Sequence, residues 1–268
     1  MRRAATMVLA AVLMASPGVA APSDAATPAG RPLTVISTLD LTGPFTTRTP
    51  WRLVATQGPQ VPDPNFDNET QPGPVSLCLA KAAGGPCVQP VANLPDSYWD
   101  AHYLDEARIV RAGAAPLLWL RTSSLQGVNG DQAILVQALA YRRGPDRFEQ
   151  VYALTTGRNN NQSVRFVETG PLAGAVISAV PTQNAPFGYW IVVSRLAVSH
   201  PGTGGVFAPV LRYRSVTRYG DGNPLAVIDS EMPGIFQRLG LWRAGQPLPL
   251  PKGPCPRPHL VKGALWCG

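Results

Sequence analysis

Two carboxylates lie two residues apart in the segment AVIDSE, near the C-terminal end of the sequence. On a β-strand, Asp229 and Glu231 would share a face, because successive side chains point to opposite sides of the strand. Cleavage of a glycosidic bond needs two carboxyl groups, one as an acid and one as a base or nucleophile. The alternative is that both residues belong to the first turn of a helix, where DSEMP fits a capping arrangement. Asp229 and Glu231 are therefore the catalytic residues of one alternative function, a carbohydrate-active hydrolase.

Arginine residues recur at alternate positions in the segment LRYRSVTRY. Period-two alternation places Arg212, Arg214 and Arg218 on one side of a strand. Guanidinium groups hold carboxylate, sulfate or phosphate through paired hydrogen bonds, so this row predicts an anion-binding face. The alternative is a solvated sheet face whose arginines pair with Glu149 and Glu168. Further arginines on neighbouring candidate strands and turns would extend the face: Arg142, Arg143, Arg147, Arg158 and Arg165.

Asn159, Asn160 and Asn161 form a polar run in TTGRNNNQSVRF, between two candidate strands. Asparagine tolerates positive φ and bonds to its own backbone, so the run is typical of a hairpin corner. Its amides also suit sugar hydroxyls, and three consecutive residues exceed what a tight turn requires. We predict that the run joins two other turn residues, Asp131 and Asp221, and the arginine face in one ligand-binding rim. Aromatic rings nearby in the sequence could stack on the sugar: Trp119, Trp190, Tyr152 and Tyr189.

Residues for nucleophilic or metal-assisted catalysis form no recognisable motif. The sequence has no GxSxG elbow, the turn that presents a serine in many hydrolases. His102, His200 and His259 are its only imidazoles. None has a metal-binding spacing such as HExxH, and we interpret each as a loop or surface residue. No metal site and no cofactor are predicted, and the balance favours a protein that is not an enzyme.

Four cysteines are present, at positions that suggest two local pairs. Pairing is the expected state in an oxidising compartment. Four cysteines allow three connectivities, and we favour Cys78 with Cys87 and Cys255 with Cys267, because each pair flanks two short extended runs about a turn. A zinc site is disfavoured, because these spacings are too long for a CxxC knuckle.

The first twenty residues, MRRAATMVLAAVLMASPGVA, combine a positive start with an apolar run that ends in small residues. This is the layout of a secretory signal peptide, with cleavage after Ala20. No stretch reaches the roughly 20 apolar residues that span a bilayer, so the protein is not expected to span a membrane. Residues 21–30 are predicted as a disordered lead-in and residues 31–268 as a single domain. We expect an exported protein, either periplasmic or secreted.

The charge balance is moderately basic. The 23 basic and 16 acidic side chains give a net charge of +7, which falls to about +5 when Arg2 and Arg3 leave with the leader. This excess permits contact with anionic surfaces. With export, it argues against nucleic acid as a partner.

Short runs of β-branched and aromatic residues alternate with turn residues through most of the chain. Turn chemistry recurring between such runs predicts an all-β, antiparallel, hairpin-rich single domain. Only segments 97–113 and 230–242 have helical features, with Ser97 and Ser230 as candidate caps. The candidate strands are 33–41, 51–57, 74–80, 116–124, 132–143, 147–156, 163–169, 174–180, 188–196, 209–219 and 225–231.

Two architectures fit this pattern of strands. The groups 117–156, 163–196 and 209–242 have somewhat similar lengths, which would suit the blades of a small β-propeller. Base rates slightly favour a β-sandwich.

The combined expectation is an exported, soluble binding or envelope-associated protein. Its predicted partner is a polar or anionic glycan, or another anionic component of the cell envelope. The alternatives are the hydrolase based on Asp229 and Glu231, and a structural protein without a small ligand.

Overall fold

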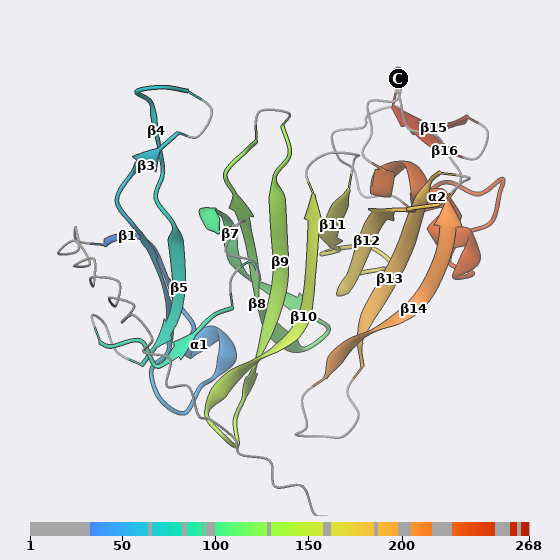
Figure 1. Cartoon of the computed structure of the whole chain (residues 1–268). Helices are drawn as coiled ribbons and strands as arrows, with labels where there is room; N and C mark the ends of the chain where they lie inside the picture. Colours follow the sequence, from blue (N-terminus) through green and yellow to red (C-terminus); the bar gives the residue numbers. More distant parts are fainter. Residues whose placement is uncertain are drawn as a thin grey trace, which may run out of the picture. The chain divides into compact units, whose positions relative to one another are not determined.

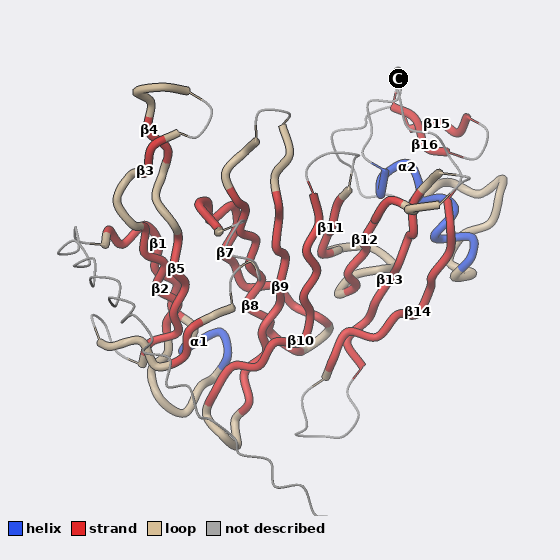
Figure 2. Tube along the Cα trace, in the orientation of Figure 1, coloured by secondary structure: helices blue, strands red, loops and turns tan. Residues whose placement is uncertain are grey.

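The computed structural model describes residues 33–63, 66–81, 85–92, 94, 100–127, 130–157, 162–184, 187–197, 205–215, 227–249, 258–261 and 264–267. The predicted signal peptide and lead-in lie outside these residues. Within them, most strands belong to three four-stranded antiparallel sheets, and two of these sheets are built entirely from consecutive strands of the chain. Figure 1 shows the three sheets, and Figure 2 shows how little of the described chain is helical.

Sheet 1 is formed by β1 (Thr34–Asp40), β2 (Arg52–Gln57), β5 (Val75–Ala80) and β6 (Gln89–Pro90), in that order. The short helix α1 (Thr42–Phe45) joins the first two strands. A small hairpin of β3 (Val61–Pro62) and β4 (Thr70–Gln71) is inserted before β5.

Sheets 2 and 3 are continuous meanders. Sheet 2 contains β7 (Ala101–Ala112), β8 (Ala115–Ser124), β9 (Ala133–Arg142) and β10 (Arg147–Gly157). Sheet 3 contains β11 (Ser163–Phe166), β12 (Ala175–Pro181), β13 (Tyr189–Ala197) and β14 (Val206–Ser215). Every pairing within these sheets joins sequence neighbours, as expected when short turns connect antiparallel strands.

Sheet 2 packs against sheet 1 on one face and against sheet 3 on the other. It can do so because the side chains on both of its faces are largely apolar. One face places Leu118, Leu120, Leu139 and Phe148 in a core shared with sheet 1. The other face places Leu117, Trp119, Val136 and Val151 in a core shared with Phe166, Val176 and Phe207 of sheet 3. Sheet 2 is thus buried between its neighbours.

Sheet 3 is covered on its far face by the longer helix, α2 (Val227–Arg238). Ile177, Ile191 and Val193 of the sheet pack there against Ile235 and Phe236 of the helix. The helix ends at Arg238, and Gly240, two residues later, has a φ of +69° that permits the terminating turn. A last hairpin, β15 (Pro258–Val261) and β16 (Ala264–Cys267), follows.

The prediction of an all-β, antiparallel, hairpin-rich domain is confirmed. Two local predictions are wrong. Segment 97–113 was expected to hold a helix, but its described part from Ala101 is strand β7, because it pairs along its length with β8. The described part of the expected strand 225–231, from Val227, is instead the start of α2, which begins there rather than at Ser230. Three packed sheets combine the face-to-face contacts of a sandwich with the repeated meanders expected of a propeller.

His102 also differs from its predicted place in a loop or on the surface. It belongs to β7 and is buried, and its Nδ1 lies 2.6 Å from the carbonyl oxygen of Pro72. We interpret it as a structural residue that ties β7 to the segment before β5.

No helix among the described residues is both long and apolar enough to cross a membrane.

Candidate functional site

A guanidinium stacked on an exposed tryptophan marks the face of sheet 3 that bears the predicted arginine row. Arg212 on β14 lies over the ring of Trp190 on β13, with 4.5 Å between the guanidinium carbon and the ring centroid. Trp190 is 37% exposed, and Arg212 is exposed. Among the described residues Arg212 forms no ion pair with an acid. A cation over an aromatic ring is held in place while its N–H edges stay accessible.

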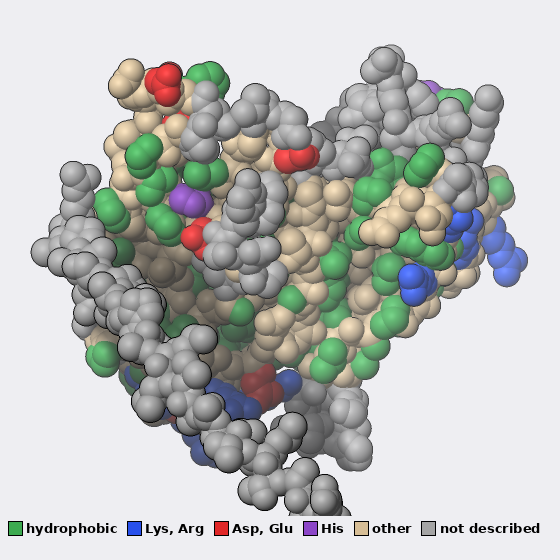
Figure 3. All heavy atoms as spheres, viewed as in Figure 1, with side chains coloured by type: hydrophobic (Ala, Val, Ile, Leu, Met, Phe, Trp, Pro, Cys, Tyr) green, Lys and Arg blue, Asp and Glu red, His purple; other side chains and the backbone are tan. Residues whose placement is uncertain are grey.

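Arg214 lies on the same face as Arg212, as the alternation predicted. Its register partner on β13 is Trp190, and one guanidinium nitrogen donates to the carbonyl oxygen of Asn184 at 2.5 Å. The intervening residue Tyr213 points to the opposite face, toward α2. We call Trp190, Arg212 and Arg214 the Trp190–Arg212 surface. Arg218 lies outside the described residues. Figure 3 shows Lys and Arg side chains over the part of the domain where β14 and α2 lie.

The predicted extension of this face is not supported for Arg142, Arg147 and Arg165, which pair with acids elsewhere. Arg142 and Arg147 both pair with Glu149 on sheet 2, through hydrogen bonds of 2.8 Å and 2.5 Å. Arg165 pairs with Asp229 on the α2 side of sheet 3. For Arg142 and Arg147, the structure agrees with the alternative of a sheet surface with ion pairs, whereas Arg165 pairs with a helix residue. Arg143 is exposed in the turn between β9 and β10, on sheet 2. Arg158 is outside the described residues.

The two strands that flank the asparagine run belong to different sheets. β10, which ends at Gly157, is the edge of sheet 2, and β11, which starts at Ser163, is the edge of sheet 3. The segment between them is therefore a connection between two sheets. Asn159, Asn160 and Asn161 lie outside the described residues, and so does Asp221.

Asp131 is found in the turn between β8 and β9, where its carbonyl oxygen accepts a hydrogen bond from the N–H of Gly127 at 2.7 Å. It therefore belongs to sheet 2, whereas Arg212 and Arg214 belong to sheet 3. The predicted rim of asparagines, aspartates and arginines stays a prediction, of which the structure describes only these three members.

Trp119, one of the aromatic residues considered for stacking on a sugar, is a core residue. It is 2% exposed, and its indole N–H donates to Glu106 at 3.1 Å. Its ring stacks on Tyr152, and burial raises the pKa of Tyr152 to about 12. Trp190 therefore differs from Trp119 in being available to a ligand.

The candidate catalytic pair does not share a face of a strand, because Asp229 and Glu231 belong to a helix. Residues two apart on a helix point in directions about 200° apart. Asp229 lies in the first turn of α2, and its carboxylate receives two hydrogen bonds from Arg165, one of them at 2.8 Å. Bonding to Asp229 raises the pKa of Arg165.

Glu231 is 7% exposed and lies between α2 and sheet 3. Its two oxygens accept hydrogen bonds from the hydroxyls of Tyr213 and Ser215, each at 2.6 Å. Arg238 covers the Tyr213 ring at 4.0 Å. A buried carboxylate must be hydrogen-bonded to persist, and these two donors fulfil that need.

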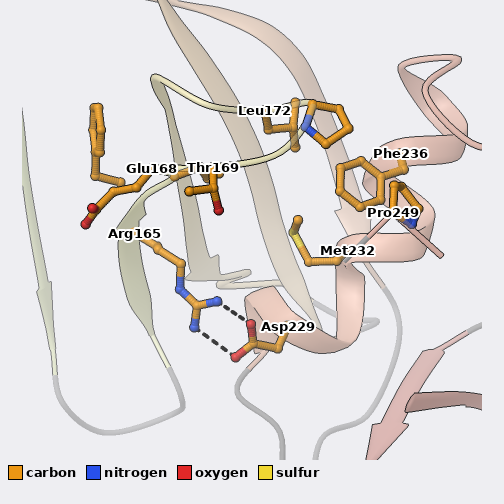
Figure 4. Close-up of a pocket in the computed structure, with 11 residues that line it drawn as sticks. Arg165, Glu168, Thr169, Leu172, Asp229, Met232, Phe236 and Pro249 are labelled. Carbon is orange, nitrogen blue, oxygen red and sulfur yellow. Dashed lines mark hydrogen bonds and ion pairs between the residues drawn. The ribbon is translucent and has the colours of Figure 1, made fainter. Parts of the chain in front are cut away.

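A pocket of about 230 Å³ opens beside Asp229, between β11, the turn that follows it, and α2. Figure 4 shows the Arg165–Asp229 pair on one side of this pocket and Leu172, Met232, Phe236 and Pro249 on the other. Sequence reasoning missed the pocket. The sequence gives no sign that Arg165 and Asp229 meet, because they are 64 positions apart and have different predicted roles.

The predicted pairing of Cys78 with Cys87 is confirmed, with a Cα–Cα distance of 5.6 Å. This disulfide joins the end region of β5 to the segment before β6. The predicted pairing of Cys255 with Cys267 falls outside the described residues, because Cys255 is not described. No group of three or more His, Cys, Asp or Glu side chains within the described ranges is placed to hold a metal ion.

Compared with known proteins, the chain matches no protein-family model, no curated protein and no solved structure. Its function is therefore inferred from the geometry of the described residues alone.

Proposed function

We propose that this chain is an exported binding protein that holds an anionic glycan on the Trp190–Arg212 surface. The observation that carries the proposal is the stacking of Arg212 on Trp190 without an acidic partner among the described residues. A disulfide between Cys78 and Cys87 supports export, because such bonds persist in oxidising compartments.

The charged part of the ligand would bind to Arg212. A guanidinium stacked on a ring has its planar N–H edges directed sideways, where a carboxylate or sulfate can accept two hydrogen bonds. The tryptophan fixes the orientation of the side chain, which reduces the conformational entropy lost on binding. Arg214, on the same strand and face, adds a second positive charge.

The apolar face of a sugar ring would rest on the exposed part of Trp190. Tryptophan combines a large apolar area with a polar edge, which suits a ligand whose surface is mixed. An amphipathic sugar acid or sulfated sugar therefore fits this surface better than a simple inorganic anion.

The hydrolase alternative gains no support from the two candidate carboxylates. Asp229 is occupied by Arg165, and Glu231 is buried against two hydroxyls. A purely structural protein would not require an arginine held over an exposed tryptophan, and a binding experiment tests this alternative.

The test is a glycan array that carries uronic-acid, sulfated, phosphorylated and neutral glycans, followed by calorimetry with the strongest binder. We expect the wild-type protein to bind acidic glycans and not their neutral counterparts. Trp190→Ala and Arg212→Gln should each weaken binding about tenfold or more, because each removes one half of the recognition surface.

The matched control is Arg195→Gln. Arg195 lies on β13 like Trp190 but on the α2 side of sheet 3, and it donates to the carbonyl oxygen of Pro171 at 3.0 Å. It should leave glycan affinity unchanged. Absence of binding to every acidic glycan, by a protein shown to be folded, would sink the proposal and favour the structural alternative.

A further inference from the structure

The pocket beside Asp229 lies on the opposite face of sheet 3 from the Trp190–Arg212 surface. Alternation along β11 and beyond directs Phe166 toward sheet 2, where it packs near Trp119, and Val167 toward α2. Arg165 follows the same alternation and meets Asp229 on α2 (Figure 4). The pocket is therefore independent of the proposed glycan surface, and a different ligand must be considered for it.

The inner wall of the pocket is apolar and nearly inaccessible. Leu172, Met232 and Phe236 are 0%, 9% and 2% exposed, respectively. The volume of about 230 Å³ lies below the roughly 300–1,000 Å³ of sites for drug-sized ligands. The ligand must accordingly be small, with a compact apolar group that displaces water from this wall.

The rim presents both signs of charge side by side. Asp229 uses two of the five N–H groups of Arg165, which leaves donors on the guanidinium and lone pairs on the carboxylate for a ligand. Glu168 does not add a second free acid, because it pairs with Arg108 on β7. Figure 4 shows its carboxylate directed away from Met232 and Phe236.

The pocket is held in shape by its surroundings. The turn between β11 and β12 is closed by a hydrogen bond of 2.7 Å from Gly174 N–H to the carbonyl oxygen of Val167. Gly174 has a φ of +80°, and a Cβ there would lie 3.0 Å from the Cα of Ala112. A site that is already formed loses less entropy when a small ligand binds.

We propose that this pocket binds a zwitterionic α-amino acid with a compact apolar side chain, of the size of leucine or methionine. The ligand carboxylate pairs with Arg165, its ammonium pairs with Asp229, and its side chain lies against Met232 and Phe236. A ligand with a single charge would take one member of the ion pair and leave the other without its partner, which is unfavourable in a partly desolvated site. A zwitterion replaces one ion pair with two.

The experiment uses the methyl group of Met232 as a reporter. Methionine occurs only at positions 1, 7, 14 and 232, so a sample labelled with ¹³C at methionine methyls has a single probe beyond residue 14, inside the pocket. Titration with L-leucine should shift this resonance saturably. Glycine, which lacks the apolar group, should not shift it at the same concentrations.

Two analogues separate the charges of leucine. 4-Methylpentanoate lacks the ammonium group and 3-methylbutylamine lacks the carboxylate, and each should bind at least about tenfold more weakly than leucine, because each leaves one member of the pair unmatched. Equal affinity of either analogue overturns the proposal. So does a Met232 resonance that leucine does not move in the folded wild-type protein.

Variants locate the site independently. Arg165→Gln and Asp229→Asn should each abolish the leucine-dependent shift. Arg147→Gln removes an arginine that pairs with Glu149 on sheet 2, and it should preserve the shift. Leucine binding that persists unchanged in both pocket variants would show that the ion pair has no part in recognition. Binding of acidic glycans is a separate readout, so either proposal can fail without the other.

Discussion

Arg165 on β11 and Asp229 on α2 face each other in a two-point ion pair that bridges 64 residues of sequence. The pair lies on the α2 side of sheet 3, whereas Arg212 lies on the other side, stacked on Trp190. On its α2 side, sheet 3 thus carries Arg165 paired with Asp229. On its other side it carries Arg212, which has no acidic partner among the described residues. This difference underlies the assignment of two separate ligands.

Glycan binding should depend on salt. Raising the ionic strength from about 0.05 M to about 0.5 M shortens the Debye length severalfold, so affinity for a sulfated or carboxylated glycan should fall markedly. The residual binding of Arg212→Gln should depend less on salt than that of the wild type, because one contributing charge is gone. Calorimetric titration at both ionic strengths provides the measurement. A salt response identical in the two proteins would exclude Arg212 as the anion-binding group.

Asp146 should contribute to stability in a pH-dependent way. Burial raises its pKa, but hydrogen bonds from Lys81, Tyr141, Trp51 and Thr49 outweigh this and hold the pKa of its carboxyl well below its usual range. A depressed pKa in the folded state gives stability that is present above the unfolded pKa, about 4, and is lost as the pH falls below it.

Asp146→Asn should therefore lower the free energy of unfolding by about 1–3 kcal/mol at pH 7. The loss should shrink as the pH is lowered from about 5 toward 3, which urea denaturation across that range can measure. Glu69→Gln, a change at an exposed acid, serves as the control and should have little effect. A deficit for Asp146→Asn that is independent of pH would contradict the explanation.

Glu231 should be important for folding rather than for catalysis. Glu231→Ala removes the acceptor of the Tyr213 and Ser215 hydroxyls from a buried site, and we expect a loss of about 2–4 kcal/mol in the free energy of unfolding. Glu231→Gln keeps the shape and one acceptor and should cost less. Chemical denaturation of both variants, beside wild type, tests this order; a smaller effect for alanine than for glutamine would be inconsistent with it.

Gly174 should tolerate alanine poorly. The substitution combines an unfavourable φ of +80° with a Cβ only 3.0 Å from the Cα of Ala112. Gly113→Ala is the matched control, because its φ is +64° but nothing lies within 4 Å of the added Cβ. We expect a loss of about 1 kcal/mol for Gly113→Ala and of about 2–4 kcal/mol for Gly174→Ala. Thermal unfolding of the two variants measures the difference, which isolates the steric contact from the backbone strain.

The Cys78–Cys87 disulfide should stabilise the domain by about 2–3 kcal/mol, as expected for a short closed loop. The double variant Cys78→Ser with Cys87→Ser should lose this amount in urea denaturation. Comparing wild type and double variant with and without reductant separates this bond from any effect at the other two cysteines. Equal stability of oxidised wild type and double variant would mean that the bond adds nothing to the folded state.

Local signals determined much of the fold. Ten of the eleven candidate strands correspond to strands of the structure. Runs of β-branched residues indicate each strand, and the short turns between runs indicate that consecutive strands pair. The turns at 144–146 and 170–174, each of which contains glycine, connect β9 to β10 and β11 to β12. The Cys78–Cys87 pairing, nine residues apart, was likewise readable from spacing.

Tertiary structure decided the remaining features, because they depend on partners distant in the sequence. Segment 101–112 is a strand since β8 supplies its hydrogen bonds, and Asp229 lies on a helix since α2 covers an apolar face of sheet 3. The sequence alone placed Arg212 and Arg214 on one face, since strand alternation is a local rule. The partner of each arginine is set only when separate strands and helices pack together. Arg165 then meets an acid, whereas Arg212 meets a tryptophan.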